Sequence, residues 1–254
     1  MSSATAEWLW GWDPTPGIVA VHAELDGRAV VWRRSAATGA VVREDERFHP
    51  WLLLDDLDDL RHLGMGLGLE GDARAAVWYR ELAGPGALRF LVSAADGRAL
   101  AAALLRGASQ RLDRPVTHLG DLPDGTVLSL PPEEQYLVAT GRTYFRDLPF
   151  DALHRLQLDL ETTGLDPAHD RIFLVALRDP DGKVEILEVA GDDHADEGEL
   201  LRRLVARVRA ADPDVIENHN LHGFDLPFLA RRARLLGVPL SLGRIGTGLR
   251  QRDA

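Results

Sequence analysis

The sequence predicts an α+β / α/β protein in two parts, a mixed α+β first half followed by a second half in the order β-β-β-α-β-α. Three observations support this fold class. Short β-like runs separated by Asp-Gly and Thr-Gly dipeptides begin the first half, apolar and polar residues alternate over 156–161, and apolar residues recur at helical spacing over 200–208. The 254 residues are 45% hydrophobic and 27% charged, which leaves room for one large or two modest domains and excludes disordered and fibrous classes.

The first half is expected to hold short elements separated by turn residues. They are a three-stranded antiparallel meander (18–21, 29–32 and 41–42), a strand at 48–54, an acidic helix start at 55–60, a strand at 87–92, and a helix at 96–106 that Gly107 ends. The strongest linker signal is Leu130-Pro131-Pro132-Glu133-Glu134, because prolines fix the backbone and cannot join a ladder. We place the boundary between 131 and 150 and divide the chain into domains 1–150 and 151–254.

The second half begins with three strands that we expect to pair antiparallel. Asp196-x-x-Glu199 resembles a capping box that opens an amphipathic helix, and Pro213 stops this helix. The other expected elements are strands at 156–161, 171–178 and 183–189, a turn at 179–182, a short buried strand at 215–216, and a last helix at about 226–236 with Pro227 in its first turn and Gly237 at its end.

Charge and composition narrow the function classes. The net charge of -11, from 29 basic and 40 acidic residues, argues against nucleic-acid binding through a broad basic face, but not against a local basic groove. The absence of cysteine excludes disulfides, thiolate zinc sites and cysteine nucleophiles, and it indicates a reducing compartment. Because the sequence shows neither a signal peptide nor an apolar stretch of about 18 residues, we expect a cytoplasmic protein without a membrane segment.

Asp159 and Glu161 are the first candidate site residues. Side chains alternate across a strand, so the two carboxylates share the face opposite the apolar residues. The polar, glycine-bearing loop 162–165 follows directly, which places the pair beside an open loop. Taken alone, the pair is more simply explained as acids that solvate the outer face of an edge strand.

A second polar cluster, 218–225, lies where the short strand gives way to the last helix. Asp225 has an ordinary explanation as a helix N-cap, and Asn220 as a turn residue. His219 and His222 are explained as polar loop residues, because no third histidine or cysteine completes a zinc set. The crowding of polar residues at one strand-to-helix junction nevertheless favours a functional site shared with the carboxylates of the first strand.

Two motifs resemble the 3′→5′ proofreading exonuclease of family B DNA polymerases, within the wider DEDD exonuclease superfamily. Asp159-Leu160-Glu161-Thr162 matches the first motif, and Asn220-x-x-x-Phe224-Asp225 matches the second. Their spacing, together with 212–215 before the second motif and 235–244 after it, makes the resemblance specific over about residues 151–244. The first half is similar to the N-terminal domain of the same polymerases through Phe48-His49-Pro50-Trp51.

The resemblance implies a ribonuclease H-like fold and a two-metal hydrolysis of 3′-terminal phosphodiesters of single-stranded DNA, in DNA replication and repair. Oxygen ligands suit Mg²⁺ or Mn²⁺, and two ions about 4 Å apart stabilise the attacking hydroxide and the leaving 3′ oxygen. Carried over to this sequence, Asp159 would bridge both ions, Glu161 would bind the ion that activates water, and Asp225 would hold the other. The residues that would contact the single-stranded 3′ end are Thr162, Leu165, Asn220 and Phe224.

The chain departs from the family in its third motif, a tyrosine with an aspartate four residues on, which supplies the fourth carboxylate. No tyrosine follows Tyr144, the only acid after Asp225 is Asp253, and no His-x-x-x-x-Asp follows Asp225. The polymerase palm is absent from these 254 residues as well. We therefore expect the N-terminal and partial exonuclease region of a family B DNA-directed DNA polymerase, incomplete at its C-terminus, as a fragment or split-gene product. It would act on primer-template DNA beside a separate or missing polymerase portion, with weak or no exonuclease activity alone.

Two other hypotheses stay open. One is a non-catalytic nucleic-acid-binding accessory module with a ribonuclease H-like fold, which would bind single-stranded DNA in a chelator and would not cleave it. The other is a free-standing DEDD nuclease that acts on RNA, against which the similarity of the first half speaks. Within this chain, any grip on DNA is expected from Arg231, Arg232 and Arg234 near the last helix.

Overall fold

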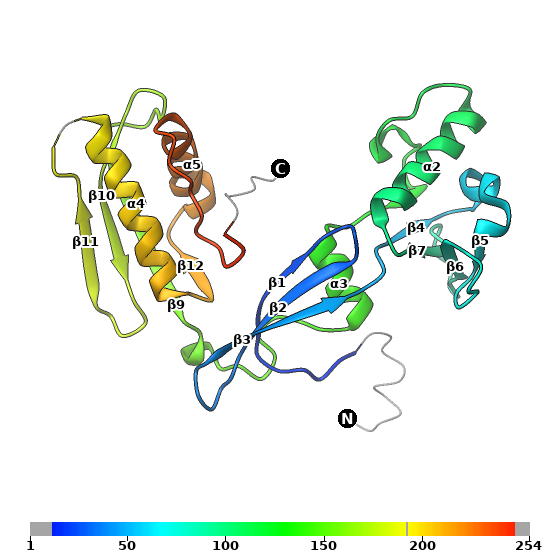
Figure 1. Cartoon of the computed structure of the whole chain (residues 1–254), viewed down its shortest axis with the longest axis horizontal. Helices are drawn as coiled ribbons and strands as arrows, with labels where there is room; N and C mark the ends of the chain where they lie inside the picture. Colours follow the sequence, from blue (N-terminus) through cyan, green and yellow to red (C-terminus); the bar gives the residue numbers. More distant parts are fainter. Residues whose placement is uncertain (1–11, 192, 247–254) are drawn as a thin grey trace. The chain divides into compact units, whose positions relative to one another are not determined.

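The structure, a computed structural model, describes residues 12–191 and 193–246. The chain divides into two compact units, Met1–Leu148 and Pro149–Ala254 (Figure 1). Each unit contains hydrophobic core residues of its own. Within the described ranges, no helix is long and apolar enough to cross a membrane. Asp253 lies outside the described residues.

The first unit contains two sheets together with helices, which agrees with its predicted mixed α+β character. A three-stranded sheet in the order β1-β2-β3 is antiparallel throughout, which confirms the meander. A five-stranded sheet has the order β5-β6-β7-β4-β8. The strands are β1 (Ile18–Ala23), β2 (Arg28–Arg34), β3 (Val41–Arg47), β4 (Trp51–Leu54), β5 (Leu67–Leu69), β6 (Val77–Glu81), β7 (Phe90–Ala94) and β8 (Val127–Leu128).

Two strands begin later than predicted. β4 begins at Trp51 rather than at Phe48, and β7 begins at Phe90 rather than at Ala87. Phe48 is buried and packs edge-on against Tyr136, with 5.7 Å between the ring centroids. Phe48 therefore serves core packing between elements instead of sheet pairing.

Helix α2 (Gly97–Leu112) is capped by the side chain of Asp96, but it does not end at Gly107. A β-carbon at Gly107 would lie 1.6 Å from the carbonyl oxygen of Asp59. Glycine is present because α2 approaches the backbone of the segment Asp58–Gly66 too closely for any side chain. That segment also differs from the predicted acidic helix start, because it forms 3₁₀ turns.

Gly107→Ala is expected to destabilise the first unit, since the added methyl group overlaps a main-chain carbonyl. Overpacking costs about 1–3 kcal/mol, and a fixed backbone places this variant at the upper end. Thermal unfolding followed by tryptophan emission measures the effect, because all six tryptophans precede residue 149. The control is Gly120→Ala, whose new β-carbon has no atom within 4 Å. A midpoint unchanged by Gly107→Ala would contradict this packing.

The proline-rich linker prediction is wrong. Pro132 begins helix α3 (Pro132–Thr140), where its missing amide hydrogen is no loss because first-turn amides have no helical partner. Gln135 is buried, accepts a hydrogen bond at Oε1 from the Trp51 amide at 2.8 Å, and donates from Nε2 to the Leu130 carbonyl at 2.7 Å. The segment is therefore a packed part of the first unit.

The second unit is built on a four-stranded sheet in the order β11-β10-β9-β12. Its first three strands pair antiparallel as predicted, and β12 runs parallel to β9 with Ile216 opposite Leu156. A parallel pair needs a crossover connection, which contains α4. The elements are β9 (Arg155–Thr162), β10 (Ile172–Arg178), β11 (Val184–Glu188), α4 (His194–Ala211), β12 (Val215–Glu217) and α5 (Leu226–Leu235). Strands and both helices contribute to one core (Figure 1).

The helix ends of the second unit follow local sequence signals, with one correction. Asp193, not Asp196, caps α4, because its Oδ1 accepts a hydrogen bond from the Asp196 amide at 2.8 Å. The predicted capping box is therefore placed too late along the chain. Pro227 lies in the first turn of α5, and Gly237 follows its end with φ at +64°, as predicted.

Candidate active site

Strand β9 presents two carboxylates on its exposed face. Burial alternates along the strand, so that Asp159 and Glu161 are exposed while Leu158 and Leu160 are buried in the core. This confirms the predicted alternation. The two acids therefore lie on the solvent-exposed face of the sheet, opposite the face that packs into the core.

The second cluster forms a tight turn between β12 and α5. Asn220 adopts the left-handed conformation, with φ at +61°, and the five residues Leu221–Asp225 form a π-turn that runs into α5. A β-carbon on Gly223 would lie 2.2 Å from Oδ1 of Asn220, so glycine makes room for the asparagine side chain. π-turns are often found at functional sites, and this one turns Asp225 inward.

Asp225 is not a conventional N-cap. Its side chain is 2% exposed and makes no capping hydrogen bond to α5. Burial raises the pKa of the Asp225 carboxyl, and the negative charge of Asp159 adds to this rise. Hydrogen bonds from Asn218 and from the backbone of Leu160 act in the opposite direction. A buried carboxylate beside a second acid is the arrangement expected of a cation site.

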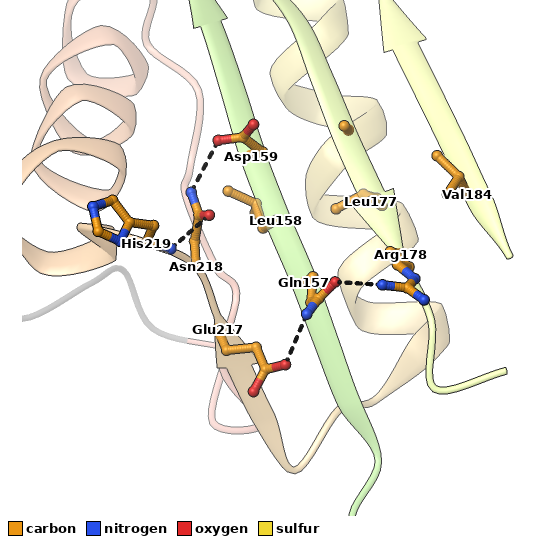
Figure 2. Close-up of a pocket in the computed structure, with 10 residues that line it drawn as sticks. Gln157, Leu158, Asp159, Leu177, Arg178, Val184, Glu217, Asn218 and His219 are labelled. Carbon is orange, nitrogen blue, oxygen red and sulfur yellow. Dashed lines mark hydrogen bonds between the residues drawn. The ribbon is translucent and has the colours of Figure 1, made fainter. Parts of the chain in front are cut away.

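Asn218 brings the two carboxylates to one side chain. Its Nδ2 donates to Oδ1 of Asp159 at 3.1 Å, and the same side chain acts to lower the pKa of the Asp225 carboxyl, which places it beside both acids. The His219 amide donates to Asn218 Oδ1 at 2.7 Å, and the NH₂ group of Asn218 then points toward Asp159 (Figure 2). The sequence places Asn218 in the polar cluster 218–225 but assigns it no role of its own. Its role follows from the register, because Glu217 pairs with Gln157 and the residue directly after β12 then approaches Asp159.

Asn218→Ala is expected to uncouple Asp159 from Asp225 without unfolding the chain, because Asn218 is only half-buried. With one donor lost to both acids, Mn²⁺ affinity should fall by about 10-fold, as for other residues that orient metal ligands. Titration calorimetry with Mn²⁺ measures this. His219→Ala, which keeps the amide that orients Asn218, is the control, and equal losses in both variants would contradict the role of Asn218.

The other predicted site residues are less closely gathered. Thr162 donates from Oγ1 to the Gly164 carbonyl at 2.7 Å, and Leu165 is 82% exposed. Phe224 is half-buried and its ring lies 5.3 Å from that of Phe228. His219 and His222 are exposed loop residues. Among residues 12–191 and 193–246, no three His, Cys, Asp or Glu side chains form a group suited to a metal ion. The structure therefore brings Asp159 and Asp225 to the side chain of Asn218, and Glu161 lies on the same exposed face of β9 as Asp159.

The donor chemistry fits a hard divalent cation. Asp159 and Asp225 offer only oxygen atoms, and the neighbouring amide is neutral, which suits Mg²⁺ or Mn²⁺. A hollow of about 540 Å³ adjoins Asp159 on the exposed face of the sheet (Figure 2). Its polar lining includes Gln157, Arg178 and Glu217. Asp159 is thus accessible from this hollow.

Arg232 corrects the predicted grip on DNA. Its side chain is 2% exposed and pairs with Glu197, so it is withdrawn from any ligand on the surface. Arg231 and Arg234 remain exposed on α5. Of the three arginines, only these two are available to a phosphate backbone.

The segments that flank the second motif hold β12 in place. Arg244 donates from Nε to Oδ1 of Asp212 at 2.7 Å and from Nη2 to Oδ1 of Asp214 at 2.9 Å. Asp214 in turn accepts at Oδ2 from the His154 amide at 3.0 Å. These contacts fix the start of β12 against the start of β9, and thereby the register that brings Asn218 to Asp159.

Comparisons with known proteins find relatives of this chain among DNA polymerases. Residues 158–252 match the family model for the exonuclease domain of DNA polymerase family B. DNA polymerase 2 of Aeropyrum pernix is 36% identical over 111 residues, or 42% of this chain and 13% of that protein. DNA polymerase 1 of Pyrococcus abyssi is 32% identical over 127 residues, or 45% of this chain and 16% of that protein.

The fold of the whole chain has a counterpart among solved structures. The family B DNA polymerase from Pyrobaculum calidifontis matches 93% of this chain with a TM-score of 0.62 at 22% identity. At that identity the match shows the fold, which confirms the predicted class. The alignment covers 34% of that polymerase, so the chain spans well under half the length of the proteins it resembles.

Proposed function

From the premise that residues 158–252 are an exonuclease-domain region of the family B DNA polymerase type, we propose that the second unit is part of a site that hydrolyses 3′-terminal phosphodiesters of single-stranded DNA in the 3′→5′ direction. The observation that carries the proposal is the meeting of Asp159 and Asp225 at the side chain of Asn218. Neither the solvation of a strand face nor the capping of a helix requires that meeting. The proposal also makes the chain part of a proofreading apparatus.

Two Mg²⁺ or Mn²⁺ ions would supply an activated water and charge stabilisation at the scissile phosphate. Asp159 would contribute oxygens to both positions, Asp225 would hold one of them, and Glu161 would serve the other from the same strand face as Asp159. Asn218 keeps Asp159 and Asp225 turned toward a common point. Because Asp225 is buried, its carboxylate gains most from a cation partner.

The residues around the carboxylates would position the 3′ end. Leu165 offers an exposed apolar side chain next to the hydrogen-bonded turn that Thr162 makes. Asn220 offers its amide from the left-handed turn, and Phe224 offers a half-buried ring. Together these groups would contact the terminal nucleotide through its sugar and base. Unpaired DNA is the expected substrate, because a base must leave the stack to reach such contacts.

The 254-residue chain alone is expected to turn over slowly or not at all. Two-metal sites need enough carboxylates to balance both cations, and the described part of the chain links only two at the candidate site. The first unit, 1–150 in the proposed division, would serve as the N-terminal domain of such a polymerase, with 151–254 as the exonuclease part. Primer-template DNA and a separate polymerase portion are the proposed partners.

The test uses the whole chain, a 5′-labelled single-stranded DNA and its RNA equivalent. We expect binding that requires Mn²⁺ or Mg²⁺ and is lost in Asp159→Ala, with little or no shortening of the DNA. The matched control is Asp181→Asn, which removes an exposed carboxylate from a turn away from the site. Rapid Mg²⁺-dependent shortening that Asp159→Ala abolishes would show that the expectation of slow turnover is wrong.

Two other results would overturn the proposed function itself. DNA binding that survives both chelation and Asp159→Ala, without cleavage when Mg²⁺ returns, would favour a non-catalytic accessory module. A clear preference for the RNA end would instead indicate a ribonuclease. The salt dependence of binding separates the contribution of Arg231 and Arg234 from that of the carboxylates.

A further inference from the structure

A fully buried ion pair joins the two helices of the second unit. Glu197 on α4 is 0% exposed and Arg232 on α5 is 2% exposed. The pair is bidentate, with 2.8 Å from Nε of Arg232 to Oε1 of Glu197 and 2.5 Å from Nη2 to Oε2. Such a pair leaves little contact with solvent for either charge.

Each partner also makes one hydrogen bond outside the pair, one to the loop 163–171 and one to Ile172 directly after it. Nη1 of Arg232 donates to the Pro167 carbonyl at 3.2 Å, in the middle of the loop. The amide of Ile172, directly after the loop, donates to Oε1 of Glu197 at 3.0 Å. The loop begins one residue after Thr162, at the end of the strand that carries Asp159 and Glu161.

The loop also contains hydrogen bonds between its own residues. The Thr163 amide donates to the Arg171 carbonyl at 2.9 Å, and the Asp166 amide donates to Oδ2 of Asp170 at 2.8 Å. A β-carbon on Gly164 would lie 2.4 Å from Asp170, so the two arms of the loop approach closely. These bonds close the loop, while the ion pair attaches it to the helices.

Stability alone does not explain the pair. Burying two charges is so unfavourable that an apolar pair of similar volume is often as stable. An apolar pair cannot, however, offer a donor to the Pro167 carbonyl or an acceptor to the Ile172 amide. The ionic pair therefore adds two directional hydrogen bonds to the backbone, one at Pro167 and one at Ile172.

We propose that Glu197 and Arg232 are positioning residues that fix loop 163–171, and with it Thr162 and Leu165, beside the carboxylates. The inference rests on the proposed function for its consequence, which is the placement of the terminal nucleotide against Leu165. Its structural content, the attachment of the loop, stands on the four hydrogen bonds alone.

The test compares two double variants in the whole chain. Glu197→Met/Arg232→Met replaces the buried pair by side chains of similar length without charge. Glu199→Met/Arg202→Met is the matched control, because that ion pair lies on α4 as well and both side chains are more than half exposed. Far-UV circular dichroism gives the unfolding midpoint, and hydrogen exchange read by mass spectrometry gives the protection of the peptide 163–172.

We expect the buried double variant to stay folded while amides of the peptide 163–172 exchange at least ~10-fold faster than in the wild type. The control should leave both measurements unchanged. Oligo(dT) affinity in Mn²⁺ should fall several-fold in the buried double variant only. Wild-type exchange in the loop of the folded double variant would overturn the inference.

A conservative variant keeps the inference testable if the double variant does not fold. Arg232→Lys retains a charge for Glu197, but it lacks the second arm that reaches the Pro167 carbonyl. Its loop should exchange faster than the wild type, and unchanged exchange in folded Arg232→Lys would overturn the inference. If the wild-type chain does not bind oligo(dT) at all, the proposed function fails, while the exchange result still decides whether the pair holds the loop.

Discussion

Asp225→Asn is expected to stabilise the second unit while it weakens Mn²⁺ binding by at least about 10-fold. Burial raises the pKa of Asp225, and the charge of Asp159 raises it further, so ionised Asp225 is unfavourable in the folded state. The neutral amide removes that penalty and also removes an oxygen ligand. Opposite signs for stability and binding are the signature of a functional carboxylate, whereas a structural one would lose stability.

The pH dependence of stability provides a second test of the role of Asp225. A carboxyl whose pKa is higher in the folded than in the unfolded state destabilises the fold when the pH is above the unfolded-state pKa. This penalty disappears as the pH falls, because the carboxyl is then neutral in both states. The stability difference between Asp225→Asn and wild type should therefore shrink toward acid pH. Circular dichroism melts at several pH values measure this, with Asp181→Asn as the control that should match the wild type throughout. A loss of stability in Asp225→Asn at neutral pH would contradict the assignment.

Arg232→Met alone should lower the free energy of unfolding of the second unit by about 3–5 kcal/mol, because it leaves the 0% exposed Glu197 as an unpaired buried charge. Arg231→Met, next to it but exposed, should change stability by less than about 0.5 kcal/mol. The two substitutions are chemically identical, so the contrast isolates burial.

The chain contains its own reporter for this measurement. All tryptophans and tyrosines precede residue 149, so aromatic emission follows the first unit, while circular dichroism follows both. Arg232→Met should therefore shift the circular dichroism transition and leave the emission transition near that of the wild type. Equal stability of Arg232→Met and Arg231→Met would show that Glu197 is not an obligate partner of Arg232.

Local pattern predicted the elements that position the site, but not the packing. The alternation of Asp159 and Glu161 with buried leucines follows from the two-residue period of a strand, which needs no knowledge of the rest of the fold. The ends of α5 follow from Pro227 and Gly237 in the same way. Gly107 was misread as a helix end because the residue it approaches, Asp59, is distant in sequence.

The spacing of Glu197 and Arg232 along their helices indicates a buried pair, although both residues are charged. Glu197 precedes Leu201 and Leu204 at spacings that place it on the apolar side of α4, and Arg232 shares a helix face with Phe228. Two opposite charges on the apolar faces of neighbouring helices indicate a buried pair. Arginine was instead assigned to the surface by its charge.

The site itself was predictable only in part. Asp159 and Asp225 could be selected from motif and position, but their meeting at Asn218 depends on the parallel register of β12 with β9. The burial of Asp225 depends on the π-turn before it, for which a single sequence has no simple signature. That Glu161 shares the exposed face of β9 with Asp159 follows from the two-residue period of a strand.

The parallel pairing of β9 with β12 has a consequence for the order in which the protein folds. Hairpins β9–β10 and β10–β11 close short loops, whereas Asn218 reaches Asp159 across 59 positions of chain. Because contacts between distant residues cost more chain entropy, we expect the carboxylate pair to assemble late in folding. Cation binding would then occur only in the native state and would stabilise the pairing of β12 with β9.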